Sequence, residues 1–346
     1  MVTSYCNFHK KPLFFHIIFT KHIILLTKIL ILDKGEIMKL KKLLATTIAV
    51  STITGLSYAQ ETCLSESPVS ISKIEKELKP LLGNAKPVSV STSPIENIYE
   101  VILEVNGRKI PVYIDCSLNY LITGEIIDVK HKKNITRERV IQLKKEEAKE
   151  KAKKVSVELK KFLGAEKVEQ LKNIVGEIGL ANFSLVDVKN IPSKKAIVYG
   201  NKNSNLTIIV ITDPECPFCK RLHNSIKEVL KDKNVKFQLI MYPLPFHKYA
   251  QGLSEAVVCQ NSNEKSKKLL DEIFENQANK EKLKEISEKY KCQEGKDIIE
   301  THKEFAENVK VGGTPTMIFI IKEGKGLKIS GAYPSEKLKQ IIDVIK

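Results

Sequence analysis

The strongest constraint on the fold is a Cys-x-x-Cys motif between an apolar run and an amphipathic segment. Residues 206–212 (Leu-Thr-Ile-Ile-Val-Ile-Thr) are typical of a buried central strand. Asp213-Pro214 ends this run, and the motif Cys216-Pro217-Phe218-Cys219 follows. Apolar residues then recur at helical spacing, at Leu222, Ile226, Val229 and Leu230. The order predicts an α/β domain with both cysteines at a strand-to-helix junction.

Their positions at this junction predict different roles for the two cysteines. Cys216 would lie beside the unpaired N–H groups at the start of the helix, where the helix dipole stabilises a thiolate. Such placement lowers a thiol pKa from about 8.5 to between about 3.5 and 7.5. Cys219 would lie one turn deeper, within reach of a mixed disulfide on Cys216. We therefore predict that Cys216 is the nucleophile and Cys219 the resolving cysteine.

A zinc site and a Cys/His hydrolase are two other kinds of site in which these cysteines could take part. A zinc site would need two further ligands, but Cys259 and Cys292 each stand alone and no histidine pair has metal-ligand spacing. A Cys/His hydrolase would have three histidines available, but it gives no reason for a second cysteine three residues after the first. The candidates for such a base are His223, His247 and His302. The pattern implies neither a metal nor a dissociable cofactor.

The motif has a second part about 100 residues downstream. The segment 213–220 (Asp-Pro-Glu-Cys-Pro-Phe-Cys-Lys), together with 313–316 (Gly-Thr-Pro-Thr), resembles the thioredoxin-fold domain of the periplasmic DsbC/DsbG disulfide isomerases. The resemblance implies that the Thr314–Pro315 peptide bond is cis and faces the active-site sulfurs. It also implies that substrate contacts Thr314, Pro315, Pro217 and Phe218.

The resemblance extends upstream of the motif. Residues 112–115 (Val-Tyr-Ile-Asp) and 120–129 resemble the end of that family's cystatin-like dimerisation domain. Asn106-Gly107, between two alternating stretches, predicts a β-hairpin in the same region. By the same resemblance, Cys259 and Cys292 form a structural disulfide in a helical insertion of the thioredoxin fold.

These features give the expected organisation. We predict an α/β thioredoxin fold with a helical insertion at 194–346. A small α+β (cystatin-like) dimerisation domain at 61–130 and a long helical linker at 131–193 precede it. The linker would be a Lys/Glu-rich rod with a narrow apolar stripe.

The sequence departs from the family pattern in three places. Pro217-Phe218 carries no histidine between the sulfurs, which argues against an extreme oxidant. Val210 occupies the position where thioredoxins carry a buried aspartate. Cys63 and Cys116 have no counterpart in the family, and a bridge between them is one prediction although the sequence does not fix the connectivity.

The N-terminal 59 residues resemble targeting sequence. Lysines follow Met38, an uncharged stretch runs from Leu43 to Leu56, and Ser57-Tyr58-Ala59 forms a small-x-small cleavage site, the layout of a signal peptide. We predict that residues 38–59 are a cleaved signal peptide and that 1–37 are an untranslated upstream extension. A retained membrane anchor is the alternative for that upstream segment. Removing 1–59 leaves six cysteines, an even number that suits an oxidising compartment.

Charge does not point to nucleic acid. The 57 Lys and Arg residues exceed the 41 Asp and Glu residues, giving +16, but many lysines alternate with glutamates. The expected function is thiol–disulfide interchange in exported proteins, chiefly isomerisation through a Cys216 mixed disulfide. The expected partners are unfolded or misoxidised exported proteins, a DsbD-like membrane reductant and a second copy of the chain. An oxidase or reductase on the same fold and a periplasmic holdase chaperone remain the alternatives.

Overall fold

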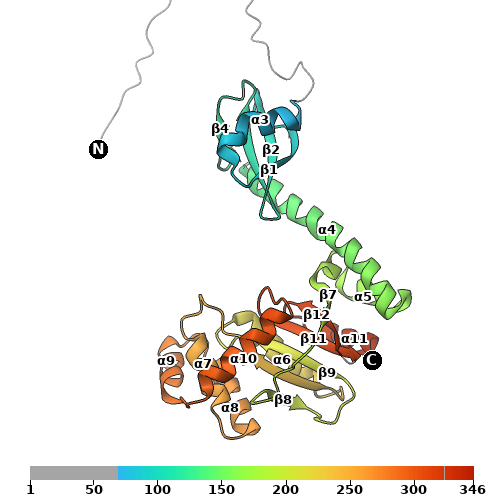
Figure 1. Cartoon of the computed structure of the whole chain (residues 1–346), viewed down its shortest axis with the longest axis vertical. Helices are drawn as coiled ribbons and strands as arrows, with labels where there is room; N and C mark the ends of the chain where they lie inside the picture. Colours follow the sequence, from blue (N-terminus) through green and yellow to red (C-terminus); the bar gives the residue numbers. More distant parts are fainter. Residues whose placement is uncertain (1–68, 323) are drawn as a thin grey trace, which may run out of the picture. The chain divides into compact units, whose positions relative to one another are not determined.

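The computed structural model describes residues 69–322 and 324–346 (Figure 1). The described residues divide into two compact units, before and after the Thr123–Gly124 bond. The predictions for the upstream extension, for the signal peptide and for Cys63 lie outside the described residues. Across the described residues, no helix combines the length and apolar character needed to span a membrane.

The first unit packs one helix on a four-stranded antiparallel sheet of order β1-β2-β3-β4. The hydroxyl of Ser70 caps the helix by accepting from the Lys73 N–H, and Ile74 and Leu78 turn inward. Asn106 and Gly107, both at positive φ, join β2 to β3 and confirm the predicted hairpin. The elements are α3 (Ile71–Leu82), β1 (Lys86–Thr92), β2 (Ile98–Val105), β3 (Arg108–Asp115) and β4 (Leu121–Ile122).

The second unit is built on a six-stranded sheet of order β7-β12-β11-β9-β10-β8. Its central pair β9–β10 is parallel, and every other pairing in the sheet is antiparallel. The strands are β7 (Phe183–Asp187), β8 (Ile197–Gly200), β9 (Thr207–Thr212), β10 (Lys236–Met241), β11 (Thr316–Lys322) and β12 (Lys325–Ser330).

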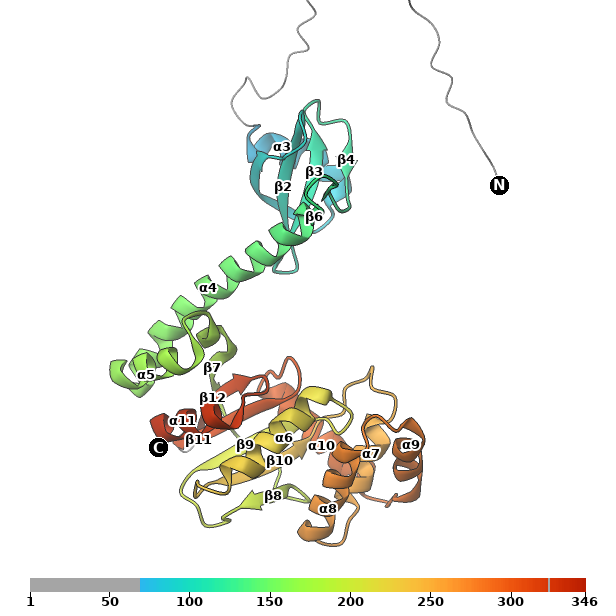
Figure 2. The same cartoon turned by 180° about the vertical axis from the view of Figure 1, so that it is seen from behind.

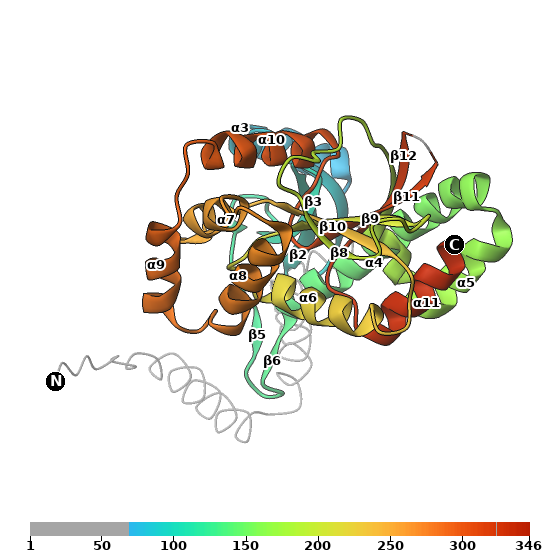
Figure 3. The same ribbon diagram turned by 90° about the horizontal axis from the view of Figure 1, so that it is seen from below.

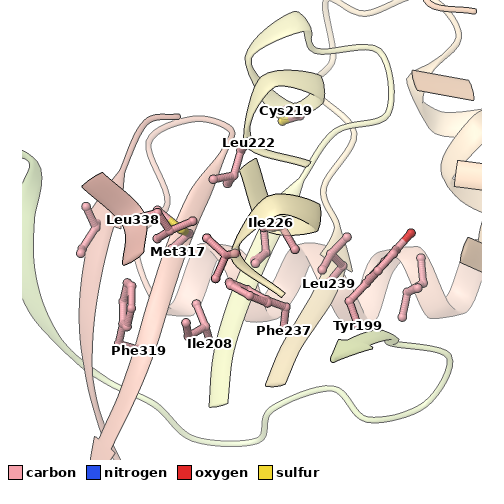
Figure 4. Close-up of a cluster of buried hydrophobic side chains, with 14 of the residues drawn as sticks. Tyr199, Ile208, Cys219, Leu222, Ile226, Phe237, Leu239, Met317, Phe319 and Leu338 are labelled. Atoms are coloured by element: carbon pink, nitrogen blue, oxygen red, sulfur yellow. The ribbon is translucent and has the colours of Figure 1, made fainter. Parts of the chain in front are cut away.

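Helices cover both faces of this sheet, and successive side chains of β9 point into the two hydrophobic cores on either face. Ile208 and Val210 pack into the larger core under α6 (Pro217–Val229) and α11 (Ser335–Ile345). Ile209 and Ile211 pack into the smaller core under α10 (Gly295–Asn308). Figure 3 shows the sheet between these helices, and Figure 2 looks onto the face covered by α6 and α11. Figure 4 shows the larger core, where residues of α6 meet Ile208, Phe237 and Met317.

A helical insertion separates β10 from β11, as predicted for a thioredoxin fold. It consists of α7 (Ala250–Val258), α8 (Asn263–Glu275), α9 (Lys280–Lys289) and α10. Cys259, at the end of α7, is bonded to Cys292, in the segment before α10. This is the pairing that the family resemblance implied. Gly295 packs against the bridge, so that a methyl group added there would lie 2.8 Å from the Cys259 sulfur.

The stretch predicted as a helical linker contains more than a rod. A short hairpin of β5 (Ile127–Asp128) and β6 (Lys133–Asn134) precedes α4 (Ile135–Leu163), which is followed by α5 (Ala165–Val175) and the 3-10 helix η2 (Ile178–Asn182). Ala152, Val155 and Leu159 of α4 belong to the larger core of the second unit. β7, which also comes from this stretch, pairs with β12. The sequence pattern shows the helices of this stretch, but β7 is short and takes its place only through pairing with a strand about 140 residues away.

Gly200 ends β8 in a conformation that no other residue adopts easily, and this gives a test of the sheet edge. Its φ is +83°, and an added methyl group would lie 2.3 Å from the Val235 carbonyl oxygen. We expect Gly200→Ala to lower the free energy of unfolding by about 3 kcal/mol, combining backbone strain with overpacking against a fixed carbonyl. Urea denaturation of the purified protein measures this.

Gly324→Ala is the matched control for this variant. Gly324 also has a positive φ, +72°, but nothing lies within 4 Å of the added methyl group. Only the strain contribution of about 1–2 kcal/mol should remain there. Equal losses in the two variants would show that the close approach to Val235 does not constrain β8.

Candidate active site

The pairing of β9 with β11 brings the two separated sequence motifs together. Ile211 is opposite Thr316 in this antiparallel pair, so the loop after β9 meets the loop before β11. Cys216 is the N-cap residue of α6 and Pro217 is its first helical residue. The Thr314–Pro315 peptide bond is cis, and the Cys216 sulfur lies 3.6 Å from the Thr314 carbonyl oxygen. The structure thus places the predicted nucleophile beside the predicted substrate-binding loop, 98 residues away in sequence.

The environment of Cys216 favours its thiolate. Its pKa is lowered to about 5, chiefly because the Cys219 thiol donates a hydrogen bond to it, with smaller contributions from the nearby N–H groups of Cys219 and Phe218. Burial opposes this shift, since only 4% of the residue is exposed. Cys216 can therefore act as a nucleophile at neutral pH.

Cys219 has the opposite tendency. Burial raises its pKa well above the ordinary value, and the neighbouring Cys216 thiolate raises it further. The Asp213 N–H lies 3.3 Å from its sulfur and partly offsets this rise. Both sulfurs are unbridged in this structure. The pair therefore consists of a buried thiol that donates to a more accessible thiolate, which suits a resolving cysteine and a nucleophile.

A buried carboxylate supports the segment just before the motif. Asp213 is fully buried and accepts from the backbone N–H groups of Glu215 and Leu244, both at 2.7 Å. His247 Nδ1 lies 2.8 Å from the same carboxylate. Asp213 therefore ties the loop between β10 and α7 to the turn that precedes Cys216. Sequence reasoning missed this role, although a carboxylate directly after a buried strand was a usable signal.

The helical insertion holds the same segment from the other side. The Glu215 carboxylate accepts from the Tyr249 N–H at 2.7 Å and from Lys280 Nζ at 3.0 Å. Gln277 donates from its amide to the Pro214 and Cys216 carbonyls, at 3.0 and 3.1 Å. No local pattern in the sequence indicated either residue, because both act across more than 30 positions of chain.

The histidines considered for a hydrolase lie elsewhere or serve Asp213. His223 Nε2 lies 2.5 Å from the Asp271 carboxylate, and its ring packs against Tyr199 and Phe274. His302 accepts from the Met241 N–H, and burial lowers its pKa to about 4. Among the described residues, no hydrogen bond joins a histidine to either sulfur of the motif. The arrangement supplies no histidine base for a Cys/His hydrolase.

The remaining predicted residues have separate places. Pro217 and Phe218 are exposed at the start of α6, beside Cys216. Val210, at the position of the thioredoxin aspartate, is buried in the larger core. Cys116 follows β3 and is a disulfide cysteine, but its predicted partner Cys63 lies outside the described residues, so that pairing stays a prediction. Within residues 69–322 and 324–346, no group of three or more His, Cys, Asp or Glu residues could hold a metal ion.

Comparisons with known proteins match the two parts of the chain separately. Residues 192–346 match the family model described as a thioredoxin-like domain. Residues 65–137 match the model described as the disulfide bond isomerase protein N-terminal domain. A search of curated proteins gave no significant match.

Solved structures resemble only part of the chain. A periplasmic thioredoxin-like protein from Salmonella enterica serovar Typhimurium is 18% identical, with 45% of this chain and 99% of that chain covered and a TM-score of 0.38. Pseudomonas aeruginosa DsbA2 is 20% identical, with 46% and 97% covered and a TM-score of 0.38. Proteus mirabilis ScsC in a compact conformation is 17% identical, with 44% and 73% covered and a TM-score of 0.38.

The two family matches and the cysteine pair at the cis-proline loop define a thioredoxin-fold thiol–disulfide oxidoreductase. A disulfide bond isomerase N-terminal domain followed by a thioredoxin-like domain is the organisation of the DsbC-like proteins. In the order of these two matched segments the chain is DsbC-like, as its motifs indicated.

The lowered pKa of Cys216 gives a pH test. We expect the alkylation rate of reduced protein by iodoacetamide to rise with pH through a midpoint near pH 5, where the thiolate forms. The folded pKa lies below the unfolded value of about 8.5, so the reduced protein should also gain stability as pH rises from about 5 to 8.5. Cys216→Ala should remove both effects. A midpoint near 8.5 would show that the site does not stabilise the thiolate.

Asp213 gives a test of the support for the motif. In Asp213→Asn one carboxylate oxygen becomes an amide that cannot accept from a backbone N–H, so a buried donor loses its partner. We expect the free energy of unfolding to fall by about 2–4 kcal/mol, measured by urea denaturation of the reduced protein.

The control for this variant is Asp343→Asn, which removes the carboxylate of an exposed pair with Lys233. It should cost less than about 1 kcal/mol. An Asp213→Asn loss no larger than the control would show that Asp213 does not hold the two loops together.

Proposed function

We propose that this chain is a protein disulfide isomerase acting on exported proteins, with Cys216 as the nucleophile and Cys219 as the resolving cysteine. The observation that carries the proposal is the pair of unbridged cysteines with oppositely shifted pKa values beside the cis Thr314–Pro315 peptide bond. The match of residues 65–137 to a disulfide bond isomerase N-terminal domain supports isomerisation over other thiol chemistry.

The chemistry follows from the two sulfurs. The Cys216 thiolate attacks a sulfur of a wrong substrate disulfide, a mixed disulfide forms, and the other substrate sulfur leaves as a thiolate. A substrate thiolate can then attack another disulfide of the substrate, which creates a new substrate thiolate. Attack of a substrate thiolate on the mixed disulfide itself forms a substrate disulfide and releases Cys216 as the thiolate. No electrons are gained or lost over this cycle.

A stalled complex has a second outcome. Cys219 attacks the Cys216 sulfur and releases reduced substrate, leaving a Cys216–Cys219 disulfide. The enzyme then needs two electrons and two protons to return to its reduced form, and a DsbD-like membrane dithiol is the donor we propose. Thr314, Pro315, Pro217 and Phe218 form the surface against which the substrate lies during both routes.

The biological setting belongs to the same proposal. Residues 38–59 direct export to the periplasm and are removed, and residues 61–130 pair two copies of the chain. The stretch 131–193 joins this dimerisation domain to the catalytic domain at 194–346. Paired domains would also give unfolded chains a surface to bind, so a chaperone activity accompanies the isomerase.

A disulfide oxidase is the second candidate, and one observation favours it. A Cys216 pKa of about 5 stabilises the reduced form and makes Cys216 a good leaving group. Both effects make the Cys216–Cys219 disulfide a better oxidant. An isomerase and an oxidase on this fold would therefore differ in the reduction potential of the Cys216–Cys219 pair and in whether that pair is kept reduced or oxidised.

The deciding experiment is reactivation of a scrambled multi-disulfide substrate by pre-reduced protein comprising residues 60–346. We expect reactivation to be lost in Cys216→Ser and partly retained in Cys219→Ser, because only the first cysteine forms the obligatory mixed disulfide. Absence of reactivation, with disulfides passed from the oxidised protein to a reduced substrate, would replace the isomerase by the oxidase. Suppression of aggregation that survives in a Cys216→Ala, Cys219→Ala variant without any thiol activity would favour a holdase.

A further inference from the structure

Four loops meet at the catalytic end of the sheet in the second unit. Thr212 is paired with Met241 in the parallel β9–β10 pair, so the loops after both strands emerge at the same end. Thr316 is opposite both Ile211 and Ser330, which adds the loop before β11 and the loop after β12. Residues 213–221, 242–249, 309–315 and 331–334 therefore lie at the same end of the sheet as Cys216, next to the loop of the insertion whose Gln277 bonds to the Cys216 carbonyl. We call their exposed part the catalytic rim.

Every acidic group in these segments is buried and used within the protein. The only acids there are Asp213 and Glu215. Asp213 accepts from Glu215, Leu244 and His247, and Glu215 from Tyr249 and Lys280. Neither carboxylate is left to oppose charge at the rim.

The cations of the rim have no such partners. Among the described residues, no ion pair includes any of the four, which are Lys220, Arg221, Lys248 and Lys310. Elsewhere in the unit, surface lysines such as Lys233 and Lys339 pair with acids. His247, the other titratable base of the rim, faces Asp213. The four loops of the rim therefore present charge of one sign to a molecule that approaches Cys216 over them, while the exposed Glu275 and Glu281 flank the neighbouring loop that carries Gln277.

Two aromatic side chains stand exposed within this positive rim. Phe218, between the two cysteines, is 49% exposed, and the Arg221 guanidinium lies over its ring at 4.2 Å. Phe246 is 76% exposed near the tip of the β10–α7 loop. Leu244 and His247, on either side of Phe246, both bond to Asp213, so that this loop is fixed beside the turn before Cys216. An exposed aromatic ring held in place on both sides is suited to contact a partner.

We propose that the catalytic rim selects cysteine-containing segments of unfolded chain that carry acidic and apolar side chains next to the reacting cysteine. The carboxylates would meet Lys220, Arg221 and Lys248, and the apolar side chains would pack on Phe218 and Phe246. The inference rests on the proposed function and adds the class of substrate that this site takes fastest. Because exposed charges act mainly on the rate of encounter, the selection is by rate and weakens as salt rises.

The test uses three disulfide-activated peptides of equal length that differ only in the residues flanking the cysteine: Glu with Leu, Gln with Leu, and Lys with Leu. Release of the activating thiol by reduced protein gives the rate of mixed-disulfide formation. At low salt we expect the glutamate peptide to react at least about 5-fold faster than the lysine peptide, with the ratio falling toward one at high salt.

The matched variants locate the effect. The triple variant Lys220→Gln, Arg221→Gln, Lys248→Gln should bring the ratio between the peptides close to one. Lys236→Gln removes one cation at the start of β10, at the opposite end of the sheet, and should leave the ratio unchanged. A ratio between two peptides cancels any change in the intrinsic reactivity of Cys216, so a shifted pKa in the triple variant cannot imitate the result.

Phe246→Ser tests the apolar part of the inference. It should slow the glutamate–leucine peptide at least about 2-fold and leave a glutamate–serine peptide unchanged. Equal slowing of both peptides would overturn the role of Phe246.

The outcomes separate the two proposals. Equal rates for the three peptides with the unaltered protein, or a faster lysine peptide, would overturn the charge selection while leaving thiol exchange in place. Failure of all three peptides to react would overturn the proposed function itself.

Discussion

The chemistry of this protein depends on one hydrogen bond, from the buried thiol of Cys219 to the thiolate of Cys216. It lowers the pKa of Cys216 to about 5 and contributes to raising that of Cys219. The two shifts are two effects of the same contact, since a single proton lies between the sulfurs. Burial of Cys219 gives the contact its direction, because the sulfur further from water is the one that keeps the proton.

The fold maintains this contact by fixing both ends of the motif. The first-turn N–H groups of α6 help to lower the pKa of Cys216, and the helix buries Cys219 one turn further on. The β9–β11 register brings Thr314 to Cys216 from nearly 100 residues away. Asp213 and Gln277 then hold the turn before α6 to the β10–α7 loop and to the helical insertion. The insertion, which contains the Cys259–Cys292 bridge, is therefore linked directly to the reactive cysteine.

Features that depend on neighbouring residues could be predicted from the sequence, whereas contacts between residues far apart in the chain could not. The β9–α6 junction and the hairpin at Asn106-Gly107 were predictable because periodicity and turn chemistry are local. The role of Gln277 was not, because its amide reaches carbonyl groups about 60 residues away that no local pattern marks. β7 shows the same limit, because its five residues form a strand only through pairing with β12. The cis bond and the insertion disulfide came instead from the family resemblance.

Two properties of the cysteine pair bear on disulfide isomerisation: how readily Cys216 leaves the mixed disulfide, and how slowly Cys219 attacks it. The same stabilisation that keeps Cys216 ionised makes it a good leaving group, so a substrate thiol can readily displace it from the mixed disulfide. Cys219 must not attack first, and its raised pKa delays it, since only a thiolate attacks. In the proposed isomerase, a slow Cys219 would leave the mixed disulfide in place while the substrate rearranges. On this argument the burial of Cys219, more than the reactivity of Cys216, separates isomerisation from simple reduction on this fold.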